Sequence, residues 1–138
     1  MAVSILLIFS ICIFSACTRS GIPLNESPHV INLDDTIPAV VTIDKPTDGQ
    51  SFASGDTIKV EGKVTDLGLY RGNISITDDA NKGILKTQDY EIHGLKEYDF
   101  SISYKTSVST LSNYTVTVWF EDHGLNVTTK TLKVRVSP

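Results

Sequence analysis

Residues 113–121 read Asn-Tyr-Thr-Val-Thr-Val-Trp-Phe-Glu, and this stretch decides the fold class. On an extended chain, successive side chains point to opposite faces, so even-numbered and odd-numbered residues separate. The even-numbered set is large and apolar: Tyr114, Val116, Val118 and Phe120. The odd-numbered set is polar apart from Trp119. This alternation predicts a β-strand with one buried face and one face near water.

The same alternation recurs on both sides of this stretch, between turns rich in Gly, Asp and Asn, and no helical period interrupts it. The predicted strands are Val40–Asp44, Asp56–Val64, Arg71–Thr77, Ile84–Thr87 with a continuation at Tyr90–Ile92, Glu97–Tyr104, Asn113–Glu121 and Val127–Val136. Short strands at this spacing predict an all-β protein. We therefore expect residues 40–138 to form a single antiparallel β-sandwich of seven to eight strands.

The segment Leu111–Asn126 resembles the F strand, F–G turn and G-strand start of bacterial immunoglobulin-like domains. The turn Pro46-Thr-Asp-Gly49, followed by Gly55-Asp56, is similar to the A–B region of the same domains. The resemblance covers Val40–Ser137 and implies an immunoglobulin-like sandwich. It matches Tyr114 to the tyrosine corner and places Val116 where antibody domains carry a cysteine, so apolar packing is expected in place of the disulfide. The fold hosts unrelated functions and implies none of them.

The N-terminal segment Ala2–Ala16 contains no charged residue and is rich in Ile, Leu and Phe. A membrane-spanning helix needs about 20 apolar residues, so this run is too short to span. An apolar run of this length followed by small residues is typical of a secretory signal peptide. We assign residues 1–16 to a signal peptide, although its start lacks the usual Lys or Arg.

Phe14-Ser15-Ala16-Cys17 resembles the bacterial lipobox, with Phe14 in place of the usual Leu. The resemblance implies lipid attachment at Cys17; the alternative is a free cysteine after an ordinary cleavage site. Residues 17–39 hold three prolines and no sustained periodicity, so we expect a flexible tether. The prediction is an exported, membrane-anchored bacterial lipoprotein of the cell envelope, with the outer membrane as its expected location.

The sequence offers no catalytic motif, and we expect neither an enzyme nor a bound cofactor. His29, His93 and His123 lack a second ligand at metal-binding spacing, and no serine elbow or phosphate loop occurs. The net charge of −4 argues against a nucleic-acid partner.

Loop carboxylates could also hold calcium, which needs six to eight oxygens around one point. The candidates are Asp66, Asp78, Asp79, Asn81 and Asp122. Turn formation is the favoured interpretation of these residues. The pair Asp34-Asp35 is interpreted as solvated charge because no further acceptor lies at ligand spacing. No metal site is predicted.

Trp119 is the most informative side chain, because its parity points it away from the core. An outward tryptophan on a central strand predicts a ligand platform, or else a ring covered by the stem of Arg71 or Lys133 from neighbouring strands. Three functions follow from these observations. The first is a non-catalytic module that binds a protein or a glycan for adhesion; the second is a structural accessory subunit of a larger envelope complex; the third is a calcium-dependent or minor enzymatic module.

Overall fold

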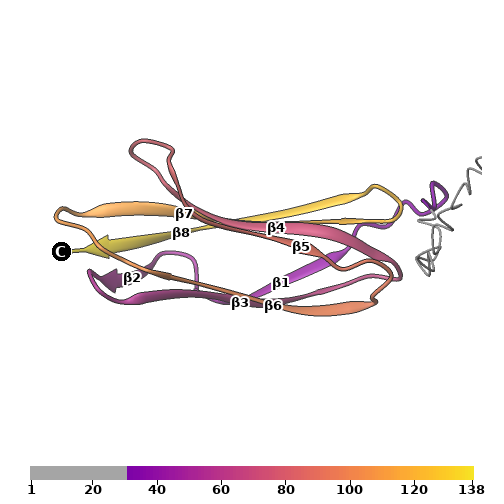
Figure 1. Ribbon diagram of the computed structural model, residues 1–138, viewed down its shortest axis with the longest axis horizontal. Coiled ribbons are helices and arrows are strands. Elements are labelled where there is room, and N and C mark those ends of the chain that lie inside the picture. Colours follow the sequence, from indigo (N-terminus) through magenta and orange to yellow (C-terminus); the bar gives the residue numbers. More distant parts are fainter. Residues whose placement is uncertain (1–30) are drawn as a thin grey trace, which may run out of the picture.

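The computed structural model describes residues 31–138, and eight strands account for most of them (Figure 1). The strands are β1 (Val40–Lys45), β2 (Gln50–Ala53), β3 (Thr57–Thr65), β4 (Leu69–Asp78), β5 (Ile84–Glu91), β6 (Glu97–Lys105), β7 (Ser112–Asp122) and β8 (Val127–Ser137). All seven predicted strands are present. β5 runs unbroken through the gap that the sequence left after Thr87.

The strands form two sheets, in the order β1-β3-β6 and β2-β8-β7-β4-β5, which lie face to face (Figure 1). This arrangement confirms the all-β, immunoglobulin-like sandwich. The sequence predicted antiparallel pairing throughout, and that is wrong for one pair: β2 runs parallel to β8. We call the three-stranded sheet the small sheet and the five-stranded sheet the large sheet.

The strand that the sequence missed, β2, has only four residues and follows a turn at Gly49, whose φ is +77°. A positive φ at this point favours glycine, which carries no Cβ. Buried Thr106 fixes the far end of β2, because its hydroxyl donates to the carbonyl oxygens of Ala53 and Asp56 at 2.9 Å each. A strand this short offers too little alternation to be recognised in the sequence.

The core lies between the sheets and consists of the side chains that the period-two pattern turned inward. Phe100 on β6 and Phe120 on β7 meet across it, with ring centroids 5.5 Å apart. Val116, which the resemblance matches to the cysteine of antibody domains, is fully buried in this apolar core. Tyr114 is buried and packs edge-on against Tyr104. Burial of such side chains supplies the main driving force for folding.

Residues 32–39, which the sequence placed in the tether, are bound to the sandwich. The amide of Asn32 donates to the carbonyl of His123 at 2.8 Å, and Ala39 is buried. The hydroxyl of Thr128 donates to the carbonyl of Ala39 at 2.5 Å. The ordered domain therefore begins before residue 40. The predicted signal peptide, Cys17 and His29 lie outside the described residues.

The two ends of the sandwich differ in their loops. Residues 31–39 and the loops 66–68, 92–96 and 123–126 meet at one end, which we call the N-terminal pole (Figure 1). The β4–β5 hairpin and the loop between β6 and β7 lie at the other end, which we call the opposite pole. Among residues 31–138 there is no helix long and apolar enough to cross a bilayer.

Candidate functional site

Trp119 lies on β7, the central strand of the large sheet, and its side chain is on the outer face. It sits in register between Asn73 on β4 and Thr129 on β8, and it is partly exposed while its neighbours Val118 and Phe120 are fully buried. The predicted outward parity of Trp119 agrees with this placement. The indole ring is thus part of the outer surface and is surrounded by polar residues.

Polar side chains beside Trp119 are held in defined orientations. The amide nitrogen of Asn73 donates to Thr87 Oγ1 at 2.8 Å and to Asp89 Oδ1 at 2.7 Å, both on β5. These bonds place the Asn73 carbonyl oxygen, the Asp89 carboxylate and the indole on one face. A partly exposed ring flanked by fixed hydrogen-bonding groups is suited to a ligand with both apolar and hydroxylated surfaces.

Hydroxyl groups extend this surface along the same face. Cross-strand pairing places Thr117 between Ser75 on β4 and Thr131 on β8, and it places Thr87 on β5 opposite Ser75. These residues were not among the site residues predicted from the sequence. Their signal was available in the odd-numbered positions of β7, but finding their neighbours required the strand register.

Arg71 lies on the outer face of β4, one diagonal position from Trp119, but its guanidinium is bound to Glu121. Its Nε lies 2.6 Å from Oε2 of Glu121, and its guanidinium carbon lies 4.9 Å from the centroid of the Tyr70 ring. The hydrogen bond that Arg71 donates to Glu121, together with the negative charge of that carboxylate, raises the pKa of Arg71. The guanidinium therefore neutralises Glu121, which is 8% exposed.

Lys133 does not lie beside Trp119. It pairs with Thr115, four residues along β7 from Trp119, and its Nζ lies 2.7 Å from Asp79 Oδ2 and 2.6 Å from Thr115 Oγ1. These two partners of the Asp79 carboxylate, the Lys133 ammonium and the Thr115 hydroxyl, lower its pKa. The structure thus separates the predicted trio: Arg71 is near Trp119, and Lys133 belongs to an ion pair closer to the opposite pole.

A second group of chemically notable side chains lies at the N-terminal pole. Carboxylate oxygens of Asp35, Asp66 and Asp122 lie within 4.8 Å of one another. Asp122 is fully buried at the end of β7, where the backbone amide of Asn126 donates to its Oδ1 at 2.9 Å and the Asn126 side chain donates to both oxygens. The sequence interpretation of Asp35 as isolated from other acceptors is therefore wrong.

The electrostatics of this trio are unfavourable for three negative charges. Burial raises the pKa of Asp66, and the charges of Asp122 and Asp35 add to that increase. The calcium candidates named from the sequence divide between the poles, since Asp78, Asp79 and Asn81 lie in or next to the β4–β5 hairpin. Sequence spacing missed the trio because its members are far apart in the chain and approach only through the fold.

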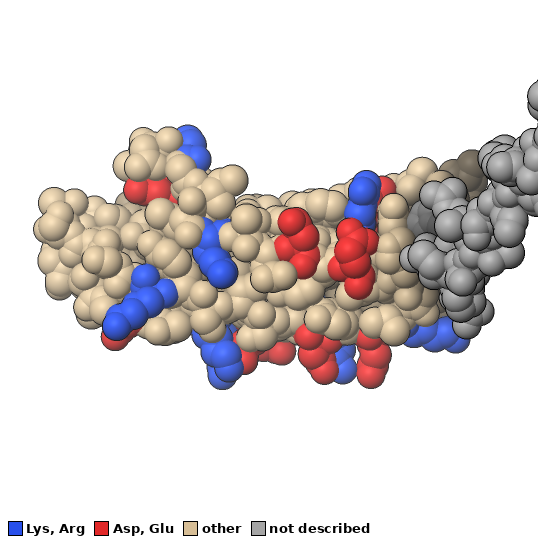
Figure 2. All heavy atoms as spheres, in the orientation of Figure 1, with Lys and Arg blue, Asp and Glu red and all other residues tan. Residues whose placement is uncertain are grey.

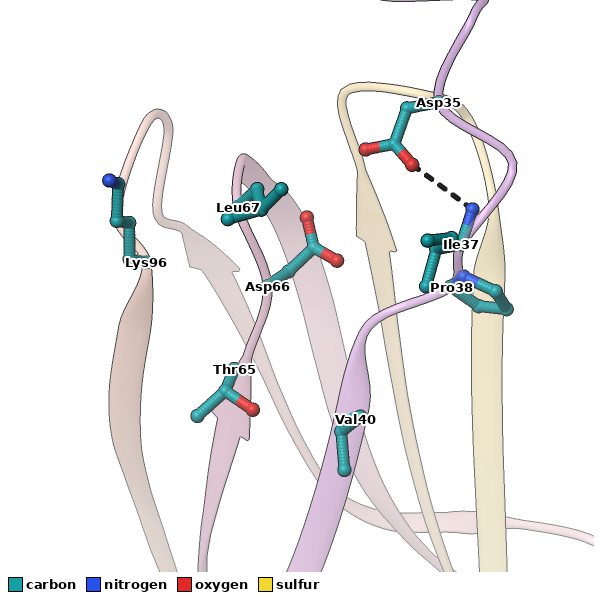
Figure 3. A pocket seen from close by; sticks show the side chains of 8 residues that line it. All are labelled: Asp35, Ile37, Pro38, Val40, Thr65, Asp66, Leu67 and Lys96. Atoms are coloured by element: carbon teal, nitrogen blue, oxygen red, sulfur yellow. Dashed lines mark hydrogen bonds between the residues drawn. The ribbon is translucent and has the colours of Figure 1, made fainter.

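A shallow groove of about 420 Å³ opens beside these carboxylates (Figure 3). Its walls are Ile37, Pro38 and Val40 on one side and Leu67 on the other, with Asp35 and Asp66 at its rim. The Oδ1 of Asp35 accepts a hydrogen bond from the amide of Ile37 at 3.0 Å, which fixes the turn that leads into β1. Apolar side chains thus dominate the wall of this groove.

His93 and His123, which the sequence treated as unrelated, meet at the same pole. Their ring centroids are 5.7 Å apart, and both rings contact Tyr70. The Nε2 of His93 lies 3.0 Å from Glu91 Oε2. On the face of the molecule that Figure 2 shows, acidic and basic side chains are interspersed along the sandwich.

Comparisons with known proteins place the fold and leave the activity open. No family model matches the chain, and no curated protein matches it. A crystal structure of an engineered protein superimposes with a TM-score of 0.53 at 20% identity, covering 74% of this chain and 20% of that chain. The chain therefore spans about a fifth of that protein's length.

Two weaker matches have TM-scores below 0.5. CopC from Methylosinus trichosporium OB3b aligns over 72% of this chain and 95% of its own, with a TM-score of 0.45 and 13% identity. Domains 4 and 5 of the S-layer protein SbsC align over 74% of this chain and 53% of theirs, with a TM-score of 0.42 and 14% identity. The likeness to the engineered protein, at 20% identity, concerns the fold alone. The protein is an immunoglobulin-like β-sandwich.

Proposed function

We propose that this protein is a non-catalytic, lipid-anchored module of the bacterial cell envelope that binds a glycan through the outer face of its large sheet. One observation carries the proposal: Trp119 is partly exposed on the central strand, between Asn73 and Thr129, on a face that also carries hydroxyls and carboxylates. Sugars present an apolar face of C–H groups and a rim of hydroxyls. An aromatic ring with fixed polar neighbours complements both features.

The polar neighbours of Trp119 support a hydroxylated ligand in particular. Asn73 and Asp89 are already bonded to each other, so they meet a ligand with less loss of side-chain entropy than free side chains would. Arg71, diagonal to Trp119 on β4, and Glu121, two residues along β7, form a second oriented pair. Adhesion through such a face requires only that the domain be held at the cell surface, and the predicted lipid on Cys17 serves that purpose.

A glycan array with the full chain and with Trp119→Ala tests the binding site. We expect defined glycans to bind the wild type, and binding to fall at least tenfold in Trp119→Ala. Thr115→Ala is the matched control, since Thr115 shares the face but lies four residues from Trp119 along β7. Equal binding by the wild type and Trp119→Ala would contradict the site. An absence of any glycan ligand, with capture of a membrane protein instead, would favour the accessory-subunit function.

The anchor is tested separately, by intact mass and membrane fractionation of the natively expressed protein. Lipidation predicts a chain that begins at Cys17, carries the mass of acyl chains and sediments with membranes. Cys17→Ala is expected to lose both the added mass and the cleavage that depends on lipidation. An unmodified Cys17 in soluble protein would refute the anchor and leave the glycan test unaffected.

A further inference from the structure

The exposed large apolar side chains of this protein are concentrated at one end of the sandwich. Eight of the ten in residues 31–138 lie at the N-terminal pole or on the first strand residue beside it: Ile31, Leu33, Ile37, Val40, Leu67, Leu95, Leu125 and Val127. Only Ile84 and Leu111 lie at the opposite pole. Single exposed apolar residues are common on soluble proteins, but a group of them at one end marks a surface that meets something else.

These side chains come from four separate segments that converge at that pole. Leu67, at the tip of the β3–β4 loop, is 79% exposed, and Leu33 and Ile37 in the entering segment are 72% and 71% exposed. Leu95 and Leu125 occupy the two remaining loops of that end. The apolar walls of the groove in Figure 3 belong to the same surface. An apolar rim at a loop end can enter the interfacial layer of a bilayer without unfolding any strand.

The chain outside the described residues indicates what covers this pole. It leaves from the pole at Ile31, and Cys17 lies fourteen positions earlier. Fourteen residues span at most about 50 Å when fully extended and average about 20 Å as a flexible coil. A lipid on Cys17 would therefore hold this end of the sandwich within about 50 Å of the membrane.

We propose that the N-terminal pole docks on the bilayer surface, with Leu67, Ile37 and Leu125 in the interfacial layer. This inference rests on the proposed lipid anchor. One lipid modification and a patch of apolar side chains reinforce each other, because the anchor raises the local concentration of the patch at the membrane. The docked domain would stand on its pole, with the Trp119 face directed sideways.

Charge at the pole favours a zwitterionic surface. Asp34 and Asp35 in the entering segment and Asp66 beside Leu67 are acidic, and Lys96 is the basic residue that lines the groove. These carboxylates would repel anionic lipid headgroups. We therefore expect docking on phosphatidylcholine and weaker docking as anionic lipid is added.

The test uses the full chain in phosphatidylcholine vesicles with brominated acyl chains, which quench tryptophan emission on contact. Trp119 is the only tryptophan, so Trp119→Phe provides a silent background. Leu67→Trp or Leu125→Trp in that background reports on the N-terminal pole. Leu111→Trp is the matched control, because Leu111 is also exposed but lies at the opposite pole. We expect brominated vesicles to quench the first two variants and to leave the control unchanged.

The outcomes separate docking from anchoring. Vesicle flotation and the mass of Cys17 report the anchor, independently of quenching. Chains that float with equal emission at positions 67 and 111 would overturn docking and leave the anchor standing. Chains that do not float would overturn both. Chains that are not quenched and that cross-link to a second copy at the N-terminal pole would also overturn docking, because the pole would then be a protein interface.

Discussion

The ring of Phe120 occupies the space in which Gly72 would otherwise carry a side chain. The two residues pair across β4 and β7, and a Cβ built on Gly72 would lie 2.2 Å from Phe120 Cδ1. Phe120 is fully buried and cannot move aside at low cost. A glycine inside a strand is unfavourable by itself, so its presence here reflects the close approach of the ring.

Gly72→Ala is therefore expected to destabilise the domain by about 1–3 kcal/mol, the usual cost of overpacking a core. Chemical denaturation of the variant and of the wild type measures this difference. Gly68→Ala is the matched control, since a Cβ at Gly68 would meet His123 at an ordinary 3.7 Å. A loss of stability at Gly68 as large as that at Gly72 would contradict the packing argument.

Adjacent residues on β7 should respond differently to truncation, because their side chains face opposite ways. Phe120→Ala removes a fully buried ring and is expected to cost about 3–5 kcal/mol in the free energy of unfolding. Trp119→Ala removes a larger ring that is only partly buried, and it should cost clearly less. Thermal melts of both variants measure the ranking. The reverse order would show that Trp119 is a core residue, and it would remove the basis for a ligand face.

The sequence alone predicted that Phe120 points inward and Trp119 outward, and it predicted most of the strands of the sandwich. Strict alternation in β3, β6, β7 and β8 fixes which side chains are buried, because a shift of one residue would expose the whole apolar set. β2 was not readable, since its four residues are held by a parallel pairing with the distant strand β8. The ordered segment before β1 was missed for the same reason: Asn32 is bound to His123, which is remote in sequence.

The candidate sites divide in the same way. Trp119 was identified from its parity alone, whereas its partners depend on register, so Lys133 was placed beside it although it pairs with Thr115. The trio of Asp35, Asp66 and Asp122 comes from the segment before β1, the β3–β4 loop and the end of β7, and it has no signature in sequence spacing. Local pattern predicts which way a side chain points, and tertiary structure decides what it meets.

Arg71 and Glu121 should be coupled in stability. Glu121 is 8% exposed, and Arg71→Ala would leave its carboxylate without the neighbouring guanidinium. We expect a measurable loss of stability, smaller than for a fully buried pair because Arg71 itself is exposed. Urea denaturation measures it. Lys63→Ala, which breaks contacts with exposed Glu97 and Asp99, is the control and should cost less stability than Arg71→Ala. Equal losses in the two variants would contradict a special role for the Glu121 pair.

Asp66 should make the domain less stable at neutral pH than at mildly acidic pH. Its pKa is raised in the folded state by burial and by the charges of Asp122 and Asp35, so the folded protein holds this proton more tightly than the unfolded chain. The stabilising contribution is fully present below the unfolded value of 3.8 and is lost as the pH rises through the higher folded value. At pH 7 the ionised Asp66 is a net cost.

Asp66→Asn removes that charge and keeps an oxygen that can accept the hydrogen bond from the Gly68 amide, which is 2.8 Å long in the wild type. We expect the variant to melt at a higher temperature than the wild type at pH 7, and the difference to shrink as the pH falls toward 3.8. Melts in EDTA and in millimolar calcium complete the test. If repulsion between the three carboxylates dominates, the variant melts at a higher temperature than the wild type in EDTA, and calcium shifts the melting temperature of neither protein. A wild type that calcium stabilises, together with a variant that calcium does not, would mean that the three carboxylates hold a cation, and the order of stability would then reverse.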